Sequence, residues 1–176
     1  MTNSSRLSPM RRCNEQAGFT LMELLLAIAV LAIVTTLALP SFTQFIQNNR
    51  LASEANEMVA SFQFARSEAL KRGLPVQVCS SSNGTNCDGG DWAQGRIAMA
   101  DPGGTDEEVL RVWASPGDDF TFNPTGGTVS FESSGFSSGA AAQEFDMQLS
   151  GCTNDSARRV LIERTGRVAS QRVACP

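Results

Sequence analysis

The sequence predicts an α+β protein in which a long N-terminal α-helix packs on a C-terminal antiparallel β-sandwich-like domain. Three observations support this fold class. Residues 19–39 form a nearly unbroken apolar run of 21 residues. Residues 41–72 then repeat apolar side chains at helical spacing. From residue 73 onward, short apolar runs alternate with clusters of Gly, Ser, Asp and Asn, which is typical of antiparallel strands joined by turns.

The apolar run is long enough to cross a membrane. As a helix it would span roughly 31 Å, about the thickness of a bilayer's hydrocarbon core. Glu23 lies near its start, and a charge at the bilayer centre costs about 2.5–3.5 kcal/mol, so this carboxylate calls for a partner. The short segment ahead of the run carries three arginines, which predicts that the rest of the chain lies outside the cytoplasm. We therefore expect residues 19–40 to be a transmembrane segment.

Residues 18–23 read Gly-Phe-Thr-Leu-Met-Glu, and the apolar run follows at once. This junction resembles the class III signal of type IV prepilins and pseudopilins. The resemblance implies that a prepilin peptidase cuts after Gly18 and methylates the new amino terminus of Phe19, so that residues 1–18 are a leader peptide. It also implies that residues 19–40 become the filament-core half of the helix and that Glu23 meets the N-terminal amine of a neighbouring subunit. Each of these opposite charges would remove the other's desolvation cost inside an apolar bundle.

Two other interpretations of the apolar run are weaker. A secretory signal peptide needs a small-x-small cleavage site after the run. The segment 36–38 (Thr-Leu-Ala) is only a passable match, and Pro40 crowds the cut. A plain membrane anchor gives no reason for Glu23.

The second half of the helix, residues 41–72, is amphipathic. Pro40 is expected to kink the helix rather than end it, because a second helical pattern follows immediately. Gly73 and Pro75 supply the stop signal. One apolar stripe is expected to pack on the C-terminal domain. Its members are Leu51, Ala55, Met58, Phe62, Ala65 and Ala69.

The remainder, residues 73–176, reads as a disulfide-bonded β domain. The predicted strands cover residues 74–80, 94–100, 108–114, 119–123, 128–132, 144–149, 158–163 and 167–173. The segment 79–87, followed by Trp92 and Gly95, resembles the GspH/FimT/FimU branch of minor pilins and pseudopilins, in which a disulfide loop precedes a Trp-x-x-Gly strand. The chain departs from that branch at Arg96 and Met99, where larger apolar residues are expected.

The cysteine pattern fits an exported protein. Cys13 lies in the predicted leader, and four cysteines remain, an even number that indicates disulfides. We predict the local pairing, Cys79–Cys87 and Cys152–Cys175, over the two other connectivities. The chain-entropy relation gives about 2.6 and 3.4 kcal/mol for loops of these lengths. A zinc site is disfavoured because no two of these cysteines are as closely spaced as zinc knuckles require.

The composition speaks against enzymatic function. The chain contains no histidine, so the Gly-x-Ser-x-Gly match at residues 135–139 lacks the base that a nucleophilic serine needs. The acidic stretch 101–108 lacks EF-hand spacing and reads as a solvated hairpin loop. The chain carries 14 Lys and Arg against 18 Asp and Glu, a net charge of −4, which argues against a generally basic nucleic-acid footprint. We predict no enzyme activity, no cofactor and no metal site.

The resemblance implies a structural role. The expected function is that of a minor pilin that helps initiate and cap type IV pilus assembly through contacts with other minor and major pilins. It would lie in the bacterial inner membrane as a single-pass protein, be processed by prepilin peptidase, and then move to the pilus, from the periplasm to the cell surface. A type II secretion pseudopilin, similar to GspH, carries the same motifs and is not separated from a pilin by this sequence.

A second class of function is DNA binding during uptake. Some FimT-type minor pilins use a C-terminal Gly-Arg-x-Arg element, of which residues 166–169 keep only the first arginine. Residues 150–176 nevertheless carry five basic and two acidic side chains, a local excess suited to double-stranded DNA. The alternative is that these arginines bind nothing and are solvated side chains at strand edges, where they discourage aggregation. The candidate arginines are Arg158, Arg159, Arg164, Arg167 and Arg172.

Overall fold

A computed structural model of the chain describes residues 18–139 and 141–175, without the side chains of residues 37–41. The chain divides into two units, residues 1–42 and residues 43–176. Within the predicted leader, residues 1–17 and therefore Cys13 lie outside the described residues.

One helix, α1 (Leu21–Arg72), connects the two units. Its start is capped by Thr20, whose hydroxyl accepts a hydrogen bond from the Glu23 N–H at 3.2 Å. The helix continues past Pro40 as expected, and it ends at Gly73, whose φ of 70° suits glycine. In the described part of the chain, no helix combines the length and apolar character needed to cross a membrane. The transmembrane segment predicted for residues 19–40 is therefore not confirmed.

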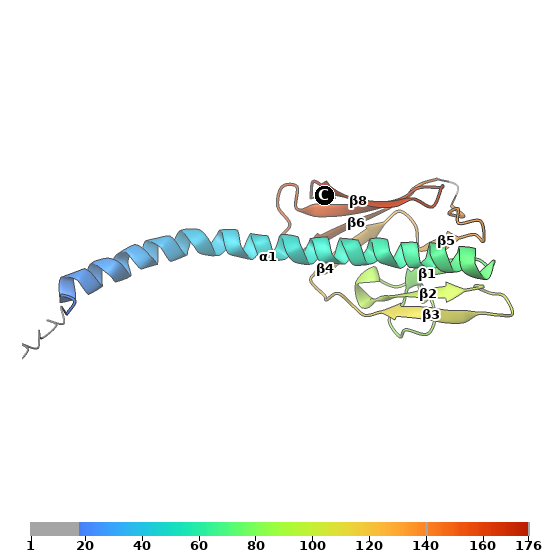
Figure 1. Cartoon of the computed structure of the whole chain (residues 1–176), viewed down its shortest axis with the longest axis horizontal. Helices are drawn as coiled ribbons and strands as arrows, with labels where there is room; N and C mark the ends of the chain where they lie inside the picture. Colours follow the sequence, from blue (N-terminus) through green and yellow to red (C-terminus); the bar gives the residue numbers. More distant parts are fainter. Residues whose placement is uncertain (1–17, 140, 176) are drawn as a thin grey trace, which may run out of the picture. The chain divides into compact units, whose positions relative to one another are not determined.

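The C-terminal part of the chain forms two four-stranded antiparallel sheets, as predicted (Figure 1). The first has the order β3-β2-β1-β5 and the second the order β4-β6-β7-β8. Each predicted strand is present within two residues of its expected limits. The first sheet contains β1 (Val76–Ser80), β2 (Arg96–Ala100), β3 (Glu108–Trp113) and β5 (Thr128–Phe131). The second contains β4 (Phe120–Pro124), β6 (Gln143–Leu149), β7 (Ala157–Ile162) and β8 (Val168–Val173).

The segment before β2 differs from the expectation. Residues Trp92–Gln94 form a short 3-10 helix, η1, and not the start of a strand. The Asp91 carboxylate accepts the Ala93 N–H at 3.0 Å and so caps this turn. Gly95 follows with a φ of 125°, a conformation that ends the turn before β2 begins. The turn also places the Trp92 ring in the core.

The main core lies between α1 and both sheets. All six residues of the predicted helix stripe are buried, at most 2% exposed, which confirms the packing role expected for them. Phe62 contacts the second sheet, with its ring centroid 5.3 Å from that of Phe145. Phe64 contacts the first sheet, with its ring 5.8 Å from that of Trp113. The helix therefore joins the two sheets into one hydrophobic core.

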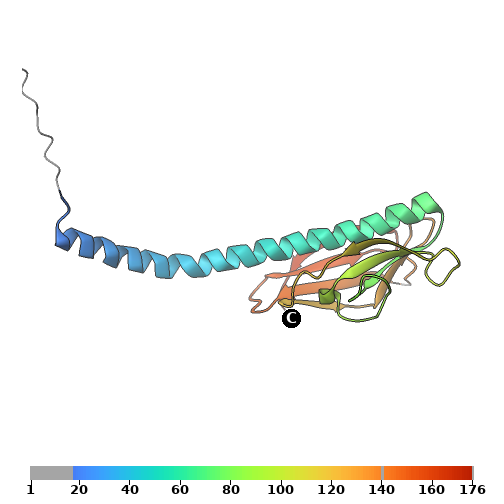
Figure 2. The same ribbon diagram turned by 90° about the horizontal axis from the view of Figure 1, so that it is seen from below.

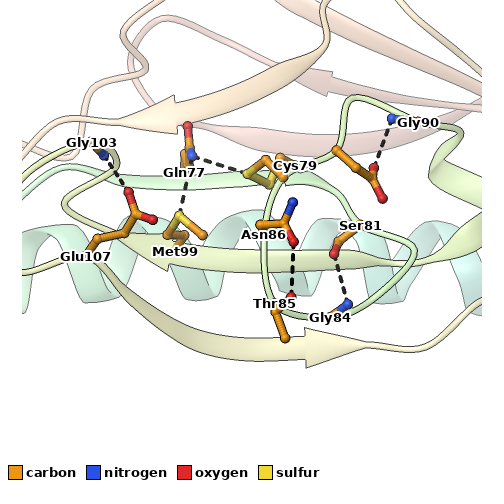
Figure 3. The surroundings of a disulfide bond; sticks show 12 residues. Gln77, Cys79, Ser81, Gly84, Thr85, Asn86, Gly90, Met99, Gly103 and Glu107 are labelled. Atoms are coloured by element: carbon orange, nitrogen blue, oxygen red, sulfur yellow. Dashed lines mark hydrogen bonds between the residues drawn. A yellow bond between two sulfur atoms is a disulfide. The ribbon is translucent and has the colours of Figure 1, made fainter.

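Both predicted disulfides, Cys79–Cys87 and Cys152–Cys175, are present. The first closes a loop over the outer face of the first sheet (Figure 3). Under it lies a small second core of Cys79, Ile97 and Met99. The Gln77 side-chain amide approaches Cys87 Sγ at 3.3 Å and Met99 Sδ at 3.8 Å. Met99, unexpected from the family resemblance, thus fits a sulfur-rich cluster.

Candidate functional site

The N-terminal unit presents an exposed apolar surface. From Phe19 to Val34 the large apolar side chains are more than half exposed, with Phe19 at 83%. Soluble monomers rarely expose so much contiguous apolar surface, so such a surface marks an interaction site. Gly18 has open space around the position of a side chain. The predicted processing site, Gly18 and Phe19, is therefore sterically accessible.

Glu23 lies on this apolar surface. It belongs to the first turn of α1, where a carboxylate is favoured by the helix dipole. It lines a shallow groove whose other walls are apolar, among them Leu26, Ala27 and Val30. Within the described residues, Glu23 has no ion-pair partner. The chain thus presents an exposed carboxylate on an apolar surface.

Three arginines fix the second half of α1 to the β domain. Arg50 makes a bidentate pair with Asp119, with distances of 2.6 and 3.1 Å. Arg66 donates from Nε to the Gly135 carbonyl and from Nη2 to the Thr165 carbonyl, each at 3.0 Å. Near the end of the helix, Arg72 Nη1 lies 2.7 Å from Glu108 Oε2. These contacts set the position of the domain along residues 50–72 of the helix.

Gly166 belongs to this attachment. A Cβ atom at this position would overlap the Gly135 carbonyl oxygen and would lie 2.7 Å from Arg66 Nε. Its φ of 77° also disfavours other residues. Gly166, which this chain shares with the Gly-Arg-x-Arg element, is thus required by its positive φ and by its close packing against Gly135 and Arg66.

A fourth arginine contact between α1 and the β domain is a buried ion pair that sequence reasoning missed. Arg96 on β2 is 1% exposed, and its Nη1 lies 2.7 Å from Glu54 Oε1 on α1. Arg96 Nε and Nη2 make no hydrogen bond within the described residues, and Glu57 Oε1 is 4.0 Å from Nη2. The sequence did contain a signal for this pair. Glu54 lies among the apolar residues of the helix stripe, and Arg96 begins a strand whose other residues are apolar.

The disulfide loop is held by side chains that act as hydrogen-bond acceptors. Asn83 Oδ1 accepts the N–H groups of Thr85 and Asn86 at 2.9 and 3.2 Å. Asp88 accepts the hydroxyl and the N–H of Ser82 at 2.6 and 2.7 Å, and the N–H of Gly90 at 3.0 Å (Figure 3). These hydrogen bonds, foremost that from the Ser82 hydroxyl, lower the pKa of Asp88 to about 2. The loop is therefore an ordered surface feature rather than a flexible linker.

The five candidate arginines do not form one patch. Arg159 is neutralised on one face of the second sheet, where its Nε lies 2.6 Å from Asp146 and its Nη1 2.9 Å from Glu144. Arg167 lies at the β7–β8 turn, 3.5 Å from Glu163. Arg164 occupies the same turn and makes no ion pair within the described chain.

The remaining two arginines face each other. Arg158 on β7 lies directly opposite Arg172 on β8, so their side chains share a face of the sheet. Strand alternation puts this pair on the face opposite to Arg159. Burial, and then the charge of Arg172, lowers the pKa of Arg158. Arg159 and Arg167 are therefore paired with carboxylates. Arg164 lies in the turn, and Arg158 and Arg172 face each other without an ion-pair partner among the described residues.

Comparisons with known proteins agree with this geometry. The sequence matches the family of type II transport protein GspH over residues 54–166, which is more than half of the chain. The chain belongs to the GspH family. The prokaryotic N-terminal methylation motif matches over residues 13–39 and covers the Gly18–Phe19 junction and Glu23.

Similar proteins are fimbrial. The chain is 31% identical over 87 residues to fimbrial protein Q of Moraxella bovis, a match that spans 49% of this chain and 55% of that protein. Two crystal structures of the type IV minor pilin FimU of Pseudomonas aeruginosa share the fold, with TM-scores of 0.59 and 0.55. Sequence identities are 22% and 23%, and the matches cover 72% and 69% of this chain and 92% of each FimU chain.

This GspH-family protein therefore carries the N-terminal methylation motif and has the fold of a type IV minor pilin. The family and the fold are those of structural proteins rather than enzymes. The methylation motif and the fimbrial relative indicate a processed protein of the cell envelope or pilus. Among the described residues, no group of His, Cys, Asp and Glu side chains could hold a metal ion.

Proposed function

We propose that this chain is a minor pilin that helps initiate and cap the assembly of a type IV pilus through contacts with other pilins. The observation that carries the proposal is the exposed apolar surface from Phe19 to Val34 with one carboxylate, Glu23, in its first turn. Apolar side chains gain free energy when a neighbouring subunit covers them. In that apolar setting, Glu23 pairs with the amino terminus of the neighbour, and the two charges neutralise each other.

Processing precedes assembly in this proposal. A peptidase cuts between Gly18 and Phe19, which frees the amine that becomes the counter-charge of a neighbour's Glu23. A bulky residue in place of Gly18 should leave an uncut precursor, detected by its larger mass. Mature protein of normal mass from a Gly18→Leu strain would defeat the processing step.

The assembly step is tested at Glu23. A Glu23→Ala variant should be processed and should keep both disulfides, yet it should be absent from sheared pili and should reduce their number as deletion of the gene does. Glu23→Asp, which keeps the charge, is the matched variant and should retain part of the activity. Normal incorporation of the Ala variant would contradict the role of Glu23 in docking.

Two alternatives share this fold. A type II secretion pseudopilin would use the same surface, and it is distinguished by whether deletion abolishes protein secretion rather than piliation. DNA uptake receives less support, because the five candidate arginines lie in separate places and Arg159 and Arg167 are already paired with carboxylates. DNA binding by the full chain that falls steeply with salt would favour it.

A further inference from the structure

Two sites on the β domain each bring together charges of one sign that have no ion-pair partner among the described residues. The positive site is the Arg158–Arg172 pair on β7 and β8. Like charges directly opposite each other across two strands are destabilising. Neither guanidinium has an ion-pair partner in the part of the chain that the structure describes. Arg158 is only partly exposed, so solvent screens its charge less than it would on an open surface.

A carboxylate placed between the two guanidinium groups would remove this repulsion. Arginine presents planar N–H groups that match the two oxygens of a carboxylate, and such charge-assisted bonds are stronger than neutral ones. A pair of arginines is therefore a natural receptor for one acidic side chain or two adjacent ones. On the opposite face of the same sheet, Arg159 makes this kind of contact with Asp146 and Glu144 of its own chain.

The negative site is the loop between β2 and β3. Asp101, Asp106 and Glu107 have no ion-pair partner among the described residues, and Asp106 and Glu107 are exposed. The loop is ordered by its own hydrogen bonds, because Glu107 Oε2 accepts the Gly103 N–H at 2.7 Å (Figure 3) and Asp101 Oδ2 accepts the Asp106 N–H at 3.1 Å. It thus presents carboxylates in a defined arrangement, and residues 101–107 are here called the acidic loop.

The β2–β3 loop and the C-terminal end of β8, which carries Arg172, lie at opposite ends of the β domain (Figures 1 and 2). The acidic loop adjoins Glu108, which pairs with Arg72 at the end of α1. Arg158 lies opposite Met147, next to the end of β6, where Leu149 pairs with Phe120 beside the Arg50–Asp119 contact. Helix residues 50 and 72 are about 33 Å apart along the axis. A contact between such sites is head-to-tail, and contacts of this kind build rings or open helical filaments rather than two-fold symmetric dimers.

We propose that the Arg158–Arg172 pair is a docking site for the acidic loop of a second copy of this chain. The proposal rests on the assembly role given above and adds to it a contact between β domains. Charge complementarity favours a protein carboxylate over DNA, because two arginines offer too few phosphate contacts for strong DNA binding. DNA binding at this pair is the competing outcome of the test.

The test uses the purified full chain in a nonionic detergent. Sedimentation measures self-association at low and high ionic strength, about 0.02 and 0.5 M, because exposed charges are largely screened at the higher value. The first variant is Arg158→Glu with Arg172→Glu, and the second is Asp106→Lys with Glu107→Lys. The third combines all four changes. The charge-matched controls are Arg164→Glu with Arg167→Glu, and Asp118→Lys with Glu132→Lys.

The parent chain should self-associate at low salt and dissociate at high salt. Each of the first two variants should weaken association about tenfold or more, since like charges then face each other. The third variant, which carries all four substitutions, should restore self-association, and both control variants should associate like the parent chain. Near-parental far-ultraviolet circular dichroism and intact disulfides in every variant show that folding is retained.

Three results would overturn the proposal. They are a parent chain that stays monomeric at low salt, reversal variants that associate like the parent, and a four-fold variant that fails to regain association. Loss of duplex-DNA binding in the Arg158→Glu/Arg172→Glu variant, with unchanged self-association, would assign the pair to DNA instead. Failure here with normal Glu23-dependent incorporation into pili would leave the proposed function intact, so the two ideas fail separately.

Discussion

The buried ion pair between Glu54 and Arg96 allows a sharp test of how the helix is attached to the β domain. Replacing Glu54 with Gln keeps the shape of the side chain and removes its charge. Arg96 then remains 1% exposed with no counter-charge in contact, since Glu57 is 4.0 Å away and half exposed. Breaking a buried pair from one side costs about 3–5 kcal/mol. That is a large part of the 5–15 kcal/mol that stabilises a typical domain.

The assay is urea denaturation of the full chain, with both disulfides intact, followed by the fluorescence of Trp92 and Trp113. Trp113 reports on the site directly, because the Arg96 guanidinium carbon lies 5.9 Å from its ring centroid. The denaturation midpoint should fall while the slope stays constant, which indicates a change in stability alone. In a thermal experiment the same loss of stability corresponds to a Tm that is lower by roughly 10–20 °C.

Two further variants separate charge from packing. Glu57→Gln removes a nearby but half-exposed carboxylate and should change stability by less than about 0.5 kcal/mol. The double variant Glu54→Met with Arg96→Met should be near the parent or more stable, because well-packed apolar residues often replace a buried ion pair at no cost. A Glu54→Gln variant within about 1 kcal/mol of the parent would refute the reasoning. So would a double variant as unstable as the single one.

The other predictions concern the domain surface and its covalent links. Gly166→Ala should destabilise the chain by about 2 kcal/mol or more, measured by urea denaturation, because the added Cβ meets the Gly135 carbonyl at a positive φ; a neutral result would contradict this. The folded-state pKa of Asp88, about 2, is below its ordinary value of 3.8, so its contribution is complete above about pH 4 and is lost as the pH falls toward 2. Asp88→Asn should flatten the pH dependence of stability in that window, and an unchanged slope would argue against it. Replacing Cys152 and Cys175 with Ser should cost about 3 kcal/mol, read as a lower urea midpoint than that of the parent; an unchanged midpoint would oppose it.

Most of the fold was predictable because its signals are local. The helix stripe from Leu51 to Ala69 follows from spacing alone, and every member is buried. The strand limits follow from turn residues such as those at 102–104 and 165–166. The pairing of Cys79 with Cys87 follows from short loop length. Short-range patterns of this kind depend only on neighbouring residues, so a sequence displays them.

The parts that were missed depend on contacts between distant segments. The turn at Trp92–Gln94 is fixed by the Asp91 cap and by burial of the Trp92 ring, which a run of strand-like residues does not reveal. In the sequence, Arg96 was recognised only as a departure from the family pattern. Its partner Glu54 was a charged residue within the apolar helix stripe. Nothing in the sequence joins the two, because they are 42 residues apart and only the packing of β2 on α1 brings them together.

By itself, the sequence predicted a processing junction at Gly18 and Phe19, and it determined a long helix with one buried stripe and a disulfide-linked β domain. Each of these depends on residue identity and on spacing along the chain. The tertiary structure alone decided which charges are compensated. Strand register places Arg158 opposite Arg172 and gives Arg159 its carboxylate partners. An electrostatic contact depends on distance through space, and the distance between two side chains is set only when the strands pair.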